Sequence, residues 1–151
     1  MNKTELLAPC GNMDSFIAAI SAGADAVYAG LKDFSARAKA KNFSYKQLNE
    51  ICSYAHTENV KVFVAVNTLV KNSEINNVFN SLEQISLAQA DAIIVQDLGV
   101  AYLSKKHFPN LKLHASTQLT IHNSYGAIQA QKMGFERVVL ARELSFNEIK
   151  K

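Results

Sequence analysis

The side chains best suited to chemistry stand at the ends of apolar runs. Five of the six apolar runs are followed directly by polar or ionisable residues. In parallel α/β folds the ligands meet the carboxyl ends of the strands, so such residues would line one concave, polar site. We predict Asp97, His114, Arg142 and Glu143 as catalytic residues and Tyr28, Asn67, Gln96 and Gln118 as substrate-binding residues.

Several of these candidates also have a structural interpretation. Arg142 beside Glu143 could bind a carboxylate or phosphate, because a guanidinium pairs with such groups bidentately, or the two could form an ion pair with each other. His114 could be a satisfied histidine of the core or its rim. Asp97 could cap the helix that follows it, and Asn67 could satisfy backbone groups of its loop. The sequence leaves these alternatives open.

The loop after the second apolar run is rich in cations. Residues 32–46 hold five basic residues and one acidic residue, Asp33, with Phe34 and Phe43 between them. Clustered basic residues with interleaved aromatic residues are typical of surfaces that bind nucleic acid. We therefore add Arg37 and Lys39 to the substrate-binding candidates. The alternative interpretation is a solvated loop without a partner.

Several catalytic patterns do not occur. The sequence contains no His-Glu-x-x-His and no Gly-x-Ser-x-Gly. The two cysteines, Cys10 and Cys52, lie far apart and show neither metal-ligand spacing nor a disulfide framework. Cys10 follows the first apolar run and is a further candidate for a nucleophile, which would meet His114 across the site. We predict no metal site within these residues.

Composition indicates a globular domain in a reducing compartment. A chain of 151 residues is long enough for one domain with a core, and the net charge of +3 does not by itself indicate a nucleic-acid partner. No apolar run is long enough to span a bilayer, and the amino terminus has no signal-peptide pattern. We therefore expect a cytoplasmic protein that has no membrane partner.

Six apolar runs alternate with five amphipathic stretches. The runs are continuously apolar, as is typical of strands buried on both faces of a parallel sheet. We predict strands at 5–8, within 22–30, at 60–67, within 88–97, at 111–115 and at 137–141, and helices at 13–22, 45–58, 73–88, 99–107 and 124–133. Ser44 and Ser73 are candidate N-caps, and Gly23 and Gly134 stand where helices would end.

This strict alternation requires right-handed crossovers and a parallel sheet. An open doubly wound sheet and a (β/α)₈ barrel both satisfy it, but the first turn lacks Gly-x-Gly-x-x-Gly and the units are short and regular, which favours the barrel. We predict an incomplete parallel (β/α) barrel over residues 1–151, with about six of its eight units, which stops within a sixth helix begun by Ser145 and Glu148. The unpaired first and last strands should promote self-association.

Five phrases of the sequence resemble the collagenase-like peptidase family, the thirty-second of the peptidase families with unassigned catalytic type. They are ELLAPCGNMDSFIAAISAGADAVYAG, VKVFVAVNTLV, DAIIVQDLGVAYL, LHASTQLTIHN and GFERVVLARELS, and they occur in the family's order. Cys10 departs from the family pattern, which mostly has alanine there. The resemblance implies a barrel catalytic domain, of which this chain would be the amino-terminal part.

The resemblance implies two kinds of activity. Relatives in this family are needed to hydroxylate bases of ribosomal or transfer RNA or a quinone precursor, and several hold an iron–sulfur cluster through cysteines in later segments. We hypothesise that the full-length parent is an iron–sulfur-dependent RNA base hydroxylation protein, with RNA as its partner and the cluster outside this chain. The alternatives are a peptidase acting on peptides or collagen and, for this chain alone, a fragment without catalytic activity.

Overall fold

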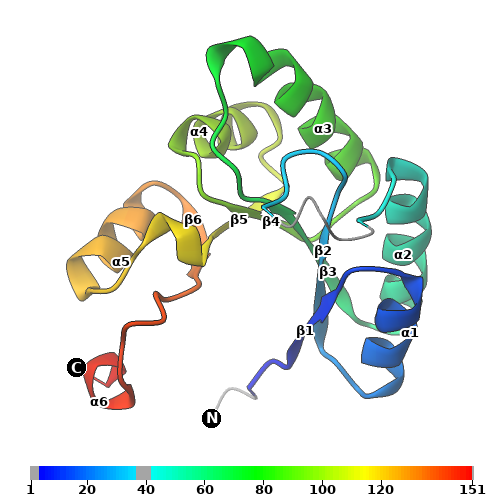
Figure 1. The fold of residues 1–151 in the computed structure, drawn as a ribbon, viewed down its shortest axis with the longest axis horizontal. Helices are drawn as coiled ribbons and strands as arrows, with labels where there is room; N and C mark the ends of the chain where they lie inside the picture. The colour runs from blue at the N-terminus through cyan, green and yellow to red at the C-terminus, as the bar shows by residue number, and fades with distance from the viewer. Residues whose placement is uncertain (1–3, 37–41, 151) are drawn as a thin grey trace.

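The structure, a computed structural model, describes residues 4–36 and 42–150 as one curved parallel sheet with helices outside it (Figure 1). The strands lie side by side in sequence order, and each pairs with the next in parallel. They are β1 (Leu7–Cys10), β2 (Ala26–Gly30), β3 (Lys61–Val66), β4 (Ala92–Val95), β5 (Lys112–Ala115) and β6 (Phe135–Val138). Since β1 and β6 do not pair with each other, the sheet is an incomplete barrel, as predicted.

A helical segment follows each strand. The helices are α1 (Met13–Ser21), α2 (Tyr45–Thr57), α3 (Ile75–Leu87), α4 (Leu98–His107), α5 (Ser124–Lys132) and α6 (Phe146–Ile149), with short 3₁₀ turns at η1 (Asn72–Glu74) and η2 (Thr117–Leu119). Within the described part of the chain, no helix has the length and apolar character needed to cross a membrane. The cytoplasmic location stays a prediction.

Local capping signals account for most helix boundaries. Ser44 caps α2 as predicted: its hydroxyl accepts a hydrogen bond from the amide of Gln47 at 3.3 Å, and the Gln47 side chain accepts one from the Ser44 amide. Gly23 and Gly134 have φ angles of 82° and 93°, the left-handed conformation expected where a helix ends. The predicted cap at Ser73 is wrong, because this residue lies inside η1 and α3 begins after it.

The predicted limits of the two edge strands are shifted by about two residues. β1 begins at Leu7 and not at residue 5, and β6 covers Phe135–Val138 and not 137–141. Glu136 belongs to β6 although it is charged, and its exposed carboxylate lies 3.3 Å from the exposed Lys112 amine on neighbouring β5. Such a cross-strand pair stabilises an exposed strand position that an apolar pattern does not reveal.

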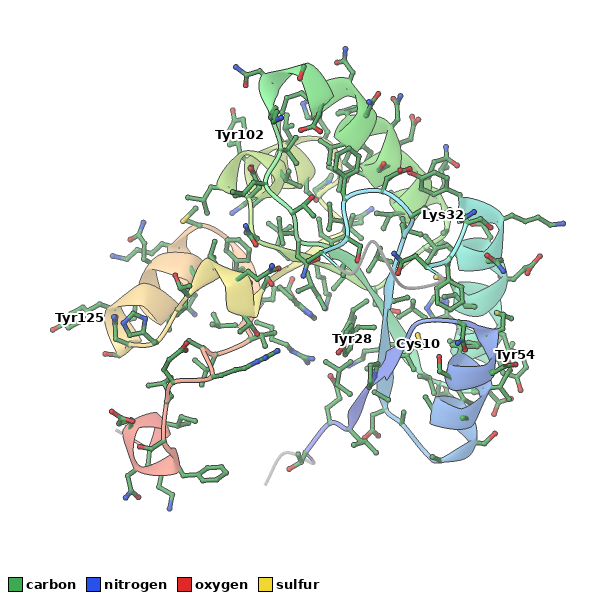
Figure 2. All side chains as sticks on the ribbon, in the orientation of Figure 1. Cys10, Tyr28, Lys32, Tyr54, Tyr102 and Tyr125 are labelled. Atoms are coloured by element: carbon green, nitrogen blue, oxygen red, sulfur yellow. The ribbon has the colours of Figure 1, made fainter. Side chains whose placement is uncertain are left out.

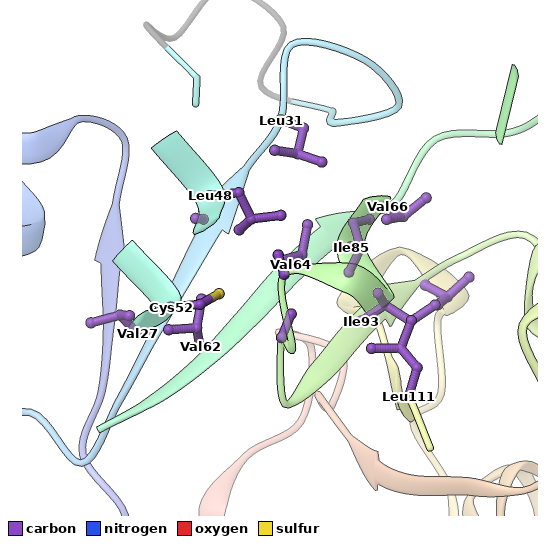
Figure 3. Packing of buried hydrophobic residues seen from close by; sticks show 14 of the residues in the cluster. Val27, Leu31, Leu48, Cys52, Val62, Val64, Val66, Ile85, Ile93 and Leu111 are labelled. Atoms are coloured by element: carbon purple, nitrogen blue, oxygen red, sulfur yellow. The ribbon is translucent and has the colours of Figure 1, made fainter. Parts of the chain in front are cut away.

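The core has two parts, one on each face of the sheet. The larger part fills the space between the helices and the outer face, where Val62 and Val64 of β3 pack with residues such as Leu48, Ile85 and Ile93 (Figure 3). The smaller part lies inside the arc and contains Ala26, Phe63, Ala92 and Ile94, with Leu7 and Tyr28 packed against it. Because both faces of the sheet are covered, the strands are apolar without alternation.

Candidate functional site

The carboxyl ends of the strands surround a cavity of about 690 Å³, which we call the mouth cavity. Its walls come from β1, β2 and β3 on one side and from the segments after β5 and β6 on the other. Tyr28, a substrate-binding candidate, lies on β2 inside the arc (Figure 2). The main polar residues lining the cavity are Tyr28, Asn67, Ser116, Gln118, Arg142 and Glu143. The structure thus brings five of the predicted residues together.

Arg142 and Glu143 lie on an exposed turn between β6 and α6. In the part of the chain that the structure describes, neither side chain forms an ion pair or a hydrogen bond, and they do not pair with each other. The alternative of a structural Arg142–Glu143 pair therefore finds no support. A guanidinium without a carboxylate partner at the rim of a cavity is available to bind an anionic ligand.

Gln118 is positioned by the turn η2, which begins directly after β5. The Ser116 hydroxyl, which is buried, accepts a hydrogen bond from the Gln118 amide at 3.3 Å and so caps this turn. Thr120 ends the turn with a left-handed φ of 55°. The turn directs the chain across the mouth, which places Gln118 and Arg142 on the same wall of the cavity.

Asn67 follows β3 on the opposite wall. Its side-chain oxygen accepts a hydrogen bond from the Ala36 amide at 3.1 Å, so Asn67 does satisfy a loop backbone group as its alternative interpretation proposed. It lines the mouth cavity as well, together with Tyr28 and Ala65. Holding the loop and lining the cavity are compatible roles, because an amide side chain offers both an acceptor and a donor.

Asp97 caps α4 and does not lie among the residues that line the mouth cavity. One carboxylate oxygen accepts hydrogen bonds from the Gly99 and Val100 amides at 2.8 and 3.0 Å. The other oxygen accepts from the Val70 amide at 3.1 Å and so fixes the loop after β3. The structure therefore gives Asp97 the capping role that was its alternative, and its geometry does not support the predicted catalytic role.

His114 lies within β5, below the mouth cavity, and is not among the residues lining it. The residue is only 5% exposed, and its ring packs edge-on against Phe63 with 4.6 Å between ring centres. Burial, aided by the nearby Arg137 guanidinium, lowers the pKa of His114 from 6.5 to about 4. Since Ala115 and Ser116 continue above it, His114 occupies the interior position that its alternative interpretation described, and a catalytic role is not supported.

Three further candidates are not placed in the mouth cavity. Arg37 and Lys39 lie outside the described residues. Gln96 follows β4, and its side-chain oxygen is buried without a hydrogen-bond partner in the described part of the chain. A buried polar atom without a partner is uncommon in a folded protein and can mark a functional position. Gln96 therefore stays a substrate-binding candidate, and the structure assigns it no role.

The two aromatic residues of the basic loop differ in burial. Phe43 is 2% exposed and belongs to the core, and Phe34 is half-buried and packs against it. The interpretation of Phe43 as a ring that stacks on bases is therefore wrong, whereas for Phe34 it stays a prediction. Phe43 is buried because it pairs with Leu31 in a parallel bridge beside the sheet.

Cys10 is buried at the end of β1 and lines a small side cavity of about 80 Å³ that shares Tyr28 and Asn67 with the mouth cavity. Its thiol donates a hydrogen bond to the Tyr28 carbonyl at 3.4 Å, and burial raises its pKa to about 12. A thiol held protonated in this way is a poor nucleophile. The geometry therefore does not support Cys10 as a nucleophile.

An ionic network that no sequence pattern indicated lies at the other end of the interior. The Glu5 carboxylate accepts hydrogen bonds from Arg137 at 2.6 Å and from Lys61 at 3.0 Å. The Arg137 guanidinium carbon lies 5.2 Å from the centre of the Phe63 ring. These four residues and His114 form what we call the floor network. Glu5 and Arg137 are separated by 132 positions, so no local pattern could have paired them.

Relatives of known name match nearly the whole chain. The uncharacterized protease MJ0090 of Methanocaldococcus jannaschii is 41% identical over 99% of this chain and 36% of its own length. The tRNA hydroxylation protein P of Helicobacter pylori is 38% identical over 100% of this chain and 37% of its own length. The 23S rRNA 5-hydroxycytidine C2501 synthase of Escherichia coli is 37% identical over 99% of this chain and 22% of its own length. The chain thus spans about a third or less of these relatives.

The fold is also found in solved structures. The structure of the U32 peptidase Mk0906 has a TM-score of 0.71 with this chain, at 11% sequence identity, over 91% of this chain and 58% of Mk0906. At such low identity the similarity establishes the fold alone. The sequence profile of peptidase family U32 matches residues 11–151 and agrees with the resemblance found in the sequence. The chain therefore belongs to peptidase family U32.

Proposed function

We propose that this chain is the substrate-binding part of an RNA base hydroxylation protein and that the mouth cavity receives the target nucleotide. The observation that carries this proposal is the guanidinium of Arg142, which has no ion-pair partner among the described residues and lies on the rim of a cavity large enough for a nucleotide. Among the chain's relatives, those named for tRNA hydroxylation and for 23S rRNA hydroxycytidine synthesis match it over 97% or more of its length.

Each of the five predicted residues that line the mouth cavity has a role in this proposal. Arg142 binds a phosphate, because its planar fork of donors matches the oxygens of that group. Gln118 and Asn67, from opposite walls, form hydrogen bonds with the edge of the base. Tyr28 supplies an aromatic surface inside the arc, as single-stranded RNA sites commonly do. Glu143 accepts a hydrogen bond from the ribose or the base.

The described residues do not fit an iron–sulfur cluster. They contain no group of three or more His, Cys, Asp or Glu side chains placed to hold a metal ion. Cys10 and Cys52 are buried, and burial raises the pKa of each thiol to about 12, which opposes the thiolate form that such clusters require. Any cluster that serves the reaction would therefore take its ligands from residues outside this described part.

The second candidate function is peptide hydrolysis. It is favoured by the family itself and by the relative named as an uncharacterized protease. The geometry supports it less well, because Cys10 is held as a thiol and His114 is buried below the cavity. Neither residue is placed to form a nucleophile–base pair with the other across the mouth cavity.

The test combines deletion of the gene with complementation. Mass spectrometry of nucleosides from total tRNA and rRNA should show a hydroxylated pyrimidine that is lost on deletion and restored by the intact wild-type gene. Arg142→Ala should not restore it. Glu136→Gln, which alters an exposed ion pair away from the cavity, should restore it fully. An unchanged nucleoside profile on deletion, together with peptide cleavage by the purified intact protein that Arg142→Ala abolishes, would instead establish the peptidase.

A further inference from the structure

The floor network joins elements that no backbone hydrogen bond joins. Glu5 precedes β1 at one end of the sheet, and Arg137 belongs to β6 at the other end (Figure 1). The Glu5 carboxylate accepts a hydrogen bond from Arg137 through one oxygen, at 2.6 Å, and from Lys61 of β3 through the other, at 3.0 Å. One carboxylate thus links the first, third and sixth strands across the inside of the arc.

The surroundings of this carboxylate favour a fixed geometry. The Glu5 side chain is 22% exposed and that of Arg137 is 35% exposed, so water competes only in part. The Arg137 guanidinium also lies over the Phe63 ring, which in turn contacts His114 edge-on. The hydrogen bond from Arg137 is the largest cause that lowers the pKa of Glu5 below 4.5, so the carboxylate is ionised at neutral pH.

The Glu5 link adds to the backbone pairing that holds β6 within the described residues. In the described residues its only strand partner is β5, and the pairing is irregular between Leu113 and His114. Beyond β6 the chain makes single backbone hydrogen bonds, from Val139 to Ala115 and from Ala141 to Ile121. Arg142 follows immediately, so a displacement of β6 would carry this residue with it.

We propose that Glu5 is a positioning residue, which holds β6 at a fixed separation from β1 and β3 and thereby places Arg142 opposite Asn67 and Tyr28. The two walls of the mouth cavity belong to the two groups of strands that Glu5 links. The identity of the ligand that binds in the mouth cavity depends on the proposed function. The separation of the cavity walls does not depend on it, so this inference and the proposed function can fail independently.

The separation can be measured with paired spin labels in the 151-residue chain. Tyr54→Cys on α2 and Tyr125→Cys on α5 place labels on opposite sides of the sector, at residues 46% and 82% exposed (Figure 2). Cys10 and Cys52 are buried, and the pKa of each thiol is raised to about 12, so they should not react with the label. Tyr54→Cys with Tyr102→Cys on α4 is the control pair, since neither helix follows or precedes β6.

Two variants weaken the same contact from opposite ends. Glu5→Gln removes the charge and leaves one acceptor oxygen where Arg137 and Lys61 now have two. Arg137→Met removes the guanidinium but keeps an unbranched stem over Phe63. Each should shift and broaden the Tyr54–Tyr125 distance distribution and leave the Tyr54–Tyr102 distribution unchanged. Arg137→Lys, which keeps the charge, should restore most of the wild-type distribution. Glu136→Gln is the matched control, because it removes an exposed carboxylate that links only the neighbours β5 and β6.

Binding supplies the second readout. Affinity of the same variants for a short pyrimidine-rich RNA, titrated by fluorescence anisotropy, should fall about tenfold in Glu5→Gln and not in Glu136→Gln, a size usual for residues that act through others. Unchanged Tyr54–Tyr125 distances in both folded variants would overturn the inference, as would unaltered affinity despite shifted distances. Failure of both variants to fold would also overturn it, because the role would then be structural. Shifted distances in a chain whose wild type binds no RNA would leave the inference standing and count against the proposed function.

Discussion

Charged side chains are paired at one end of the barrel interior and unpaired at the other, within the described residues. In the floor network each charged group is paired: Glu5 accepts from Arg137 and Lys61, and Arg137 also lies over an aromatic ring. At the mouth, Arg142 and Glu143 are exposed and form no ion pair within the described part of the chain. Both arginines stand on or just after β6, five residues apart.

The difference shows how one strand serves two purposes. A charge placed where the sheet must be held together is stabilised by fixed partners, because an unpaired charge there would be costly. A charge at the mouth remains solvated until a ligand replaces the water, and it adds little to stability meanwhile. Substitution of Arg142 should therefore lower binding alone, whereas substitution of Arg137 should lower stability as well.

The largest effect should come from Phe63→Ala. Phe63 is 2% exposed and contacts both His114 and Arg137, so its removal would leave a cavity at the centre of the floor network. We expect a loss of about 3–5 kcal/mol in the free energy of unfolding, measured by urea denaturation. Phe146→Ala is the control: this ring is 84% exposed and its loss should cost less than about 0.5 kcal/mol. Equal losses would show that the floor network is not a packed region.

The next effect concerns pH. Because the folded-state pKa of His114 is about 4 and its ordinary value is 6.5, the unfolded chain binds more protons between these values. Stability should therefore be complete above pH 6.5 and fall by up to about 3 kcal/mol as the pH drops to about 4. Denaturation at a series of pH values should show this slope in the wild type and in the exposed-residue control His122→Gln. A His114→Gln variant that keeps the full slope would refute the assignment.

A smaller effect should distinguish a capping role of Asp97 from a catalytic role. Asp97→Ala should lower stability by about 1–2 kcal/mol, because it removes the cap of α4 and the anchor of the loop at Val70. Asp97→Asn retains an acceptor and should cost less, with activity of the intact protein preserved. If Asp97→Asn were as stable as the wild type but inactive, the catalytic interpretation of Asp97 would return.

Local signals in the sequence were enough for the fold. The apolar runs and the cap at Ser44 depend on neighbouring residues, and they located the strands and most helices. The rule that functional side chains follow the ends of strands was likewise enough to predict that Arg142 and Asn67 line the same cavity. The same rule misplaced His114, because one further pleat of β5 separates it from the cavity.

What the sequence could not predict depends on distant partners. The Glu5–Arg137 bond joins residues 132 positions apart, and nothing near either residue indicates the other. The sequence also could not decide between two roles of one residue. Asp97 could cap a helix or act in catalysis, and only the three hydrogen bonds that its carboxylate accepts show that it caps α4 and holds the loop at Val70. Self-association through the edges of β1 and β6 stays a prediction.

The most direct test compares the two arginines of the β6 segment, with melting temperature and RNA affinity measured on the same preparations. Arg137→Ala should cost about 1–2 kcal/mol, which for a domain of this size lowers the melting temperature by roughly 3–6 °C. Arg142→Ala should leave the melting temperature within about 1 °C of the wild type but abolish detectable binding of a short pyrimidine-rich RNA. An Arg142→Ala variant that melts as early as Arg137→Ala, while binding RNA as the wild type does, would contradict this account.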